Sequence, residues 1–167
     1  SWIRGGGTLI ALEGANNFLA GKEGFSLSRK SRTSDESDDP EDKLRKFGDA
    51  ERAYASNMNA GSIYELTMDP THPLAFGYSD TYMSLKLGSS AFEYLDNGWN
   101  VGVAKSGVPR SGFVGKNVQE QLEQSLSFGV QNMGRGAVVY MIDNPFFRGF
   151  WHNGKLLIGN AVFFVGN

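Results

Sequence analysis

The stretch Thr8-Leu9-Ile10-Ala11-Leu12, followed at once by Glu13-Gly14-Ala15-Asn16-Asn17-Phe18-Leu19, decides the expected fold. The first five residues form a short apolar run bounded by glycines, which is typical of a strand buried on both faces in a parallel sheet. The residues after Glu13 and Gly14 are expected to form a short helix. A strand, a tight turn and a helix in this order indicate an α/β protein.

The residues before this strand indicate the end of a helix. Trp2, Ile3 and Arg4 precede Gly5-Gly6-Gly7, and glycine commonly follows the last helical turn. We therefore expect that the chain begins partway through its own fold and that the N-terminal strands of its sheet lie outside it. A core strand without those neighbours would have an exposed edge, so a homo-oligomer is also expected.

The rest of the chain contains further expected elements. Apolar segments at 126–133 and 137–142 flank Gly134-Arg135-Gly136, which predicts a β-hairpin. Alternating residues predict strands at 62–68 and 82–87, and short strands are also expected at 92–95 and 100–105. Helices are expected at 44–54, 118–122 and 156–164.

Residues 22–46 differ from the rest of the sequence because they contain few apolar residues and an acidic run from Asp35 to Asp42. This composition predicts a solvated or disordered insertion in an otherwise single domain that covers residues 1–167. The acidic run lacks the glycine and the terminal glutamate of an EF-hand loop, which argues against a calcium site.

Composition excludes several classes of function. The chain has no cysteine, so it can form no disulfide, thiolate metal site or cysteine nucleophile. Its 16 basic and 18 acidic residues give a net charge of −2, without the clustered basic face that nucleic-acid binding needs. No apolar run reaches the roughly 18 residues of a membrane span, so no membrane contact is expected.

Glu13 is the candidate catalytic residue, because a sharp turn between a strand and a helix can raise a side chain above the sheet. Its carboxylate could act as a nucleophile or a base, provided that a partner such as a histidine lies nearby. The alternative is that the turn is structural and has no chemical role. No orienting acid is evident beside either histidine, His72 or His152.

His72, Arg148 and Trp151 are the candidate binding residues. His72 precedes Pro73 and is therefore held in an extended conformation, whereas Arg148 and Trp151 lie in the aromatic segment 146–151. Arg148 could anchor a carboxylate or stack on Trp151. Structural roles are the alternative for all three, and the histidine spacing predicts no metal site in the chain.

Several segments together resemble a known family. They are 2–12, 69–78, 134–145, 147–151, Leu156-Leu157 and 160–164. In order and spacing they are similar to the class I glutamine amidotransferase-like domain that follows the catalytic domain of bacterial M14-type zinc carboxypeptidases. The resemblance implies a flavodoxin-like three-layer sandwich of the DJ-1/PfpI group, with a mostly parallel sheet plus a β-hairpin.

The resemblance also implies a function. Active relatives of this fold carry a cysteine at the turn where this chain has Glu13. The resemblance therefore implies a non-catalytic accessory domain of a secreted zinc carboxypeptidase. The upstream peptidase domain of the same polypeptide would be its partner and would hold the zinc, in an extracellular or periplasmic location. Two alternatives remain: a stand-alone hydrolase that uses Glu13, and a peptide- or carbohydrate-binding module that uses the aromatic loop 146–151. The binding alternative requires Trp99 or Trp151 to be exposed beside a cleft.

Overall fold

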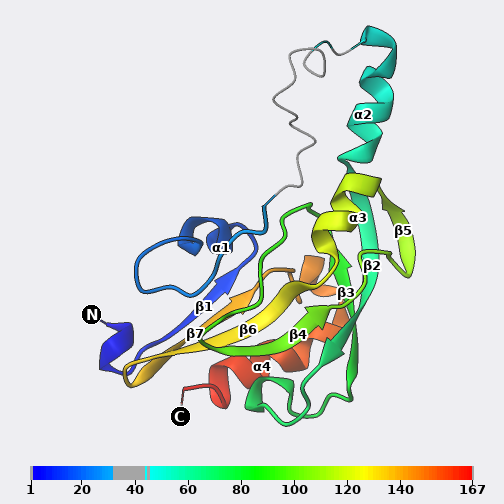
Figure 1. Cartoon of the computed structure of the whole chain (residues 1–167). Helices are drawn as coiled ribbons and strands as arrows, with labels where there is room; N and C mark the ends of the chain where they lie inside the picture. Colours follow the sequence, from blue (N-terminus) through cyan, green and yellow to red (C-terminus); the bar gives the residue numbers. More distant parts are fainter. Residues whose placement is uncertain (1, 32–43, 45, 167) are drawn as a thin grey trace.

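The computed structural model describes residues 2–31, 44 and 46–166. In it, seven strands form one mixed sheet that curls into a half-barrel, with few helices around it (Figure 1). The strands are β1 (Thr8–Leu12), β2 (Asn59–Met68), β3 (Thr81–Lys86), β4 (Trp99–Ala104), β5 (Ser111–Val114), β6 (Ser125–Met133) and β7 (Gly136–Met141). The α-helices are α1 (Gly14–Leu19), α2 (Ala50–Ser56), α3 (Lys116–Leu122) and α4 (Lys155–Phe163).

The strand directions contradict the expected flavodoxin-like sandwich. The strand order is β1-β7-β6-β4-β2-β3, with β5 also paired to β2, and β1–β7 is the one parallel pair in the described part of the chain. A parallel pair needs a long crossover, whereas a short turn reverses the chain. The turn at Gly134 and Arg135 makes β6 and β7 antiparallel. The longer loop at 69–80, which contains the 3₁₀ turn Pro73–Ala75, likewise returns the chain antiparallel from β2 to β3. The prediction of a mostly parallel sheet was wrong because it was based on β1 and the helix after it. The other strand pairs are antiparallel.

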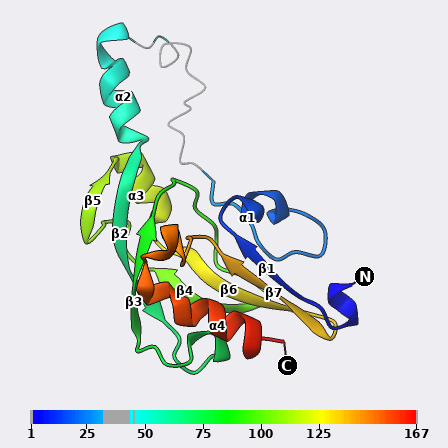
Figure 2. The ribbon, with the colours of Figure 1, turned by 180° about the vertical axis from the view of Figure 1, so that it is seen from behind.

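Each face of the sheet has its own apolar core. Helix α4 lies across the face that the curl encloses and buries Leu157 and Ala161 against strand residues such as Phe128 and Met141 (Figure 2). On the other face, Leu19 and Leu27 pack against Tyr140. The chain thus buries apolar side chains on both faces of β7, which explains the continuous apolar sequence of that strand.

The curl brings the two ends of the strand order together. Lys86 ends β3 and Asp143 follows β7, and three strands (β6, β4 and β2) separate β7 from β3 in the sheet. Their side chains nevertheless form an ion pair, with Lys86 Nζ 2.6 Å from Asp143 Oδ1. The sheet can therefore not be flat.

Most local predictions are confirmed, with shifted boundaries. The strand at 8–12, the helix after Glu13, the hairpin and the last helix are all present. The strand at 8–12 is not buried on both faces as expected, because β1 lies at the edge of the sheet and Ala11 is its one buried residue. The helix expected at 44–54 occupies 50–56 after a 3₁₀ turn, Phe47–Asp49. The strand expected at 92–95 is wrong, because only an isolated bridge between Arg29 and Phe92 forms there. Strand β5 was not predicted. The segment expected to end a helix is a 3₁₀ turn, Ile3–Gly5, and Gly6 follows it in a left-handed conformation.

The expected insertion at 22–46 falls only partly within the structure, because residues 32–43 and 45 lie outside the described part. In its first portion Leu27 is fully buried. No helix among the described residues is long and apolar enough to cross a membrane. Helix α2 extends away from the sheet (Figure 1).

Candidate functional site

Glu13 occupies a strained turn between β1 and α1. Its backbone angles, φ 44° and ψ −115°, lie in a region that costs a non-glycine residue about 1–3 kcal/mol. The surroundings hold this conformation: the Glu13 N–H donates to the Met141 carbonyl at 2.9 Å. The buried Asn16 amide donates to the same Met141 carbonyl at 2.8 Å and to the Glu13 carbonyl at 3.2 Å. Backbone strain that the surroundings hold in this way is concentrated at functional sites of proteins, so the turn is a candidate site.

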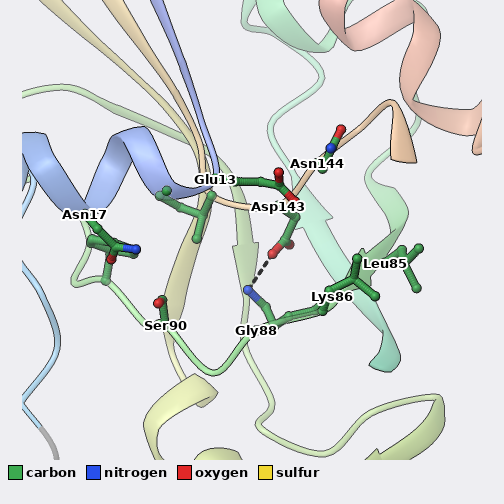
Figure 3. A pocket seen from close by; sticks show the side chains of 12 residues that line it. Glu13, Asn17, Leu85, Lys86, Gly88, Ser90, Asp143 and Asn144 are labelled. Carbon is green, nitrogen blue, oxygen red and sulfur yellow. Dashed lines mark hydrogen bonds and ion pairs between the residues drawn. The ribbon is translucent and has the colours of Figure 1, made fainter. Parts of the chain in front are cut away.

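A cavity of about 190 Å³ with both polar and apolar walls lies beside this turn, between the start of α1, the end of β3 and the residues after β7. Figure 3 shows Glu13, Asn17, Lys86, Ser90, Asp143 and Asn144 around it. The cavity therefore lies at the carboxyl ends of β1 and β7, where sheets with parallel strands commonly bind ligands. Because β3 supplies one wall, the cavity exists only in the curled sheet.

Lys86 and Asp143 form the charged centre of this site. The exposed fractions of their side chains are 3% and 4%, so both charges have lost most of their water. Asp143 Oδ1 accepts from Lys86 at 2.6 Å, and Oδ2 accepts from the Ser84 hydroxyl at 2.7 Å. Burial and, to a lesser extent, the charge of Asp143 raise the pKa of the nearby Tyr64 to about 12. The tyrosine remains a neutral donor, and its hydroxyl donates to the Gly107 carbonyl at 2.7 Å.

These contacts limit the chemistry available at the site. Each Asp143 oxygen accepts one hydrogen bond, and Lys86 binds one of them, so the two buried charges neutralise each other. The Glu13 side chain is exposed and makes no hydrogen bond or ion pair with any described residue. No group of three or more histidine or carboxylate side chains in the described part could hold a metal ion. The arrangement is thus an exposed carboxylate on a strained backbone turn, beside a buried ion pair.

The three predicted binding residues do not join Glu13. His72 lines a different cleft, together with Trp99. Arg148 is exposed, and its guanidinium lies over the Phe147 ring at 5.2 Å instead of on Trp151. The indole nitrogen of Trp151 is buried, and burial raises the pKa of the neighbouring Tyr82 hydroxyl. The structure therefore separates the candidate residues into three places.

Sequence reasoning missed the residues that build the charged centre. Tyr82, Ser84 and Lys86 alternate along β3 and are all buried, so their side chains share the enclosed face. A serine and a lysine at inward positions of an alternating strand could have signalled a buried polar partner elsewhere. Nothing in the sequence identifies that partner as Asp143.

Comparisons with known proteins do not identify the chain. No protein-family model matches it, and no curated protein sequence matches it significantly. The function is therefore inferred from the geometry described above and from the sequence resemblance.

Proposed function

We propose that this chain is a non-catalytic accessory domain of a secreted zinc carboxypeptidase. The observation that carries the proposal is that no described histidine or other base forms a hydrogen bond or ion pair with the Glu13 side chain. Nucleophilic catalysis needs a nucleophile and a base within hydrogen-bond reach of each other. At the turn that holds the cysteine in active relatives of the resembled family, this chain carries a carboxylate that makes no hydrogen bond or ion pair with any described residue. It lies next to a lysine and an aspartate that bind each other.

The resemblance supplies the rest of the proposal. The zinc, its ligands and the catalytic groups would belong to the peptidase domain of the same polypeptide, in an extracellular or periplasmic location. The present domain would stabilise that peptidase domain or help to position its substrate. The resembling segments include β1, β7 and most of α4, whereas β2 to β6 lie outside them.

The first test is the molecular context of the natural protein. An antibody raised against this chain should capture, from the medium or periplasm of the source cells, a polypeptide longer than 167 residues. That polypeptide should contain about one zinc ion and release C-terminal amino acids from peptides, and 1,10-phenanthroline should abolish this activity. Capture of a zinc-free polypeptide without peptidase activity would contradict the proposal.

The second test separates the accessory domain from the hydrolase alternative. Wild-type chain, Glu13→Gln and the exposed control Glu23→Gln are compared on ester, amide and glycoside substrates. We expect no turnover by any of the three. Turnover that Glu13→Gln abolishes and Glu23→Gln retains would show that Glu13 is catalytic and would overturn the proposal.

A further inference from the structure

A second cleft, of about 370 Å³, shares no lining residue with the Glu13 cavity. Its walls carry Asp69, Thr71, His72, Trp99, Asn132 and Phe164. Its volume is within the range of small-molecule sites, which combine apolar surface with a few fixed polar groups. The expected aromatic loop at 146–151 contributes none of these residues.

Trp99 provides a flat apolar surface in this cleft. It is the first residue of β4 and is paired with Val130 of β6, so the sheet fixes its backbone. The side chain is nevertheless 55% exposed, and its ring lies 6.1 Å from the His72 ring at 48°. Phe164 is another half-exposed ring of the same cleft. An exposed tryptophan beside a cleft is the feature that the binding alternative required.

The polar groups around Trp99 are fixed in position and include both donors and acceptors. Asp69 Oδ1 accepts from the Thr71 hydroxyl at 2.5 Å and from its N–H at 3.0 Å, while Oδ2 has no partner among the described residues. His72 Nδ1 accepts from the Leu74 N–H at 3.0 Å, so the proton of the neutral ring is on Nε2. Burial lowers the pKa of His72, which keeps this ring neutral at pH 7.

We propose that this cleft binds a neutral saccharide, with the C–H face of a sugar ring on Trp99 and its hydroxyls on Asp69, His72 and Asn132. Sugar hydroxyls both donate and accept, so they match a carboxylate oxygen, an imidazole N–H and an amide. A cationic side chain could use Trp99 and Asp69, but it would leave the His72 N–H without an acceptor. Because hydrogen bonds within the turn at 69–75 already hold Asp69 and His72, binding needs little ordering of these two side chains.

The proposal can be tested with the chain as it exists. Gluco-, xylo-, manno- and N-acetylglucosamine hexasaccharides, together with lysine- and tryptophan-containing hexapeptides, are titrated to about 10 mM. Binding is followed through the indole N–H signals of the three tryptophans in ¹H–¹⁵N spectra and, because Trp99→Ala lacks the Trp99 signal, through the backbone N–H signals of the cleft residues Thr71 and Asn132 in every variant. The variants are Trp99→Ala, Asp69→Asn and the control Phe150→Ala, which removes an aromatic ring that is 56% exposed outside the cleft.

We expect at least one hexasaccharide to shift the Trp99 signal. Trp99→Ala should weaken its binding at least about tenfold, and Phe150→Ala less than about twofold. Asp69→Asn should weaken it without abolishing it, because the amide oxygen still accepts. The thermal unfolding midpoint of each variant confirms that it is folded. The proposal is overturned if no saccharide shifts the Trp99 signal, if Trp99→Ala leaves the affinity unchanged, or if only the peptides bind.

Discussion

The two ends of the sheet contrast in how they are stabilised. At the β1 end, a parallel strand pair and α1 are held by contacts close to the Glu13 turn, and the buried Asn16 makes most of them. At the β3 end, an antiparallel strand contributes Lys86, whose only ionic partner in the described chain is Asp143, 57 residues away. A local sequence pattern can specify the first kind of end, whereas the second depends on the whole curl.

The largest expected effect on stability follows from removing the Lys86–Asp143 contact, which joins the two ends of the sheet. Lys86→Met keeps the length of the buried side chain but leaves the Asp143 carboxylate without its cation. We expect unfolding free energy to fall by about 3–5 kcal/mol in guanidinium denaturation. The matched control is Lys105→Met, at an exposed position after β4, which should change it by less than about 0.5 kcal/mol. Equal effects of the two substitutions would mean that Lys86 is solvated.

A smaller effect is expected from the local contacts of the β1 end. Asn16→Ala removes the amide that donates to Ala11, Glu13 and Met141 carbonyls and should cost about 2 kcal/mol. The neighbouring Asn17→Ala is the control, because the Asn17 side chain makes no hydrogen bond with a described residue and the change in helix propensity is the same. Equal denaturation midpoints for the two variants would show that Asn16 does not hold the turn.

The backbone strain at Glu13 predicts that glycine at this position is more stable than alanine. At φ 44° and ψ −115° glycine is less strained than alanine. Glu13→Gly should therefore be more stable than Glu13→Ala by about 1 kcal/mol. The comparison of these two variants removes any effect of the carboxylate. If Glu13→Ala were the more stable of the two by urea denaturation, the strained turn would be absent.

The parts of this structure that were predictable are the ones specified by neighbouring residues. Gly134-Arg135-Gly136 marks the hairpin, and the apolar run before Glu13 marks β1. The sheet as a whole was predicted wrongly, because strand direction depends on connections such as the return from β2 to β3. The Lys86–Asp143 centre could not be predicted either, since its partners meet only after the sheet has curled.

The smallest expected effect is a pH dependence in the cleft of Trp99. Burial lowers the pKa of His72 below 6.5, so below that pH the unfolded chain binds a proton that the folded chain resists. Stability should therefore fall as the pH is lowered from about 6.5 through the folded pKa of His72. In His72→Asn, which keeps an acceptor for the Leu74 N–H, the fall between pH 7.5 and 5.5 should be smaller. An NMR titration that gives His72 a pKa above 6.5 would contradict the expected burial.

The most direct test of the curled sheet is a double-mutant cycle on Lys86 and Asp143, with Lys86→Met, Asp143→Leu and the double variant. The exposed pair Arg110–Glu65, with Nη2 and Oε2 2.7 Å apart, is the control. If the curl brings the two ends of the sheet together, the coupling free energy of Lys86 and Asp143 should be at least about 2 kcal/mol, and that of Arg110 and Glu65 less than about 1 kcal/mol. A coupling of Lys86 and Asp143 within about 0.5 kcal/mol of zero would contradict the closure of the sheet, and with it the cavity beside Glu13.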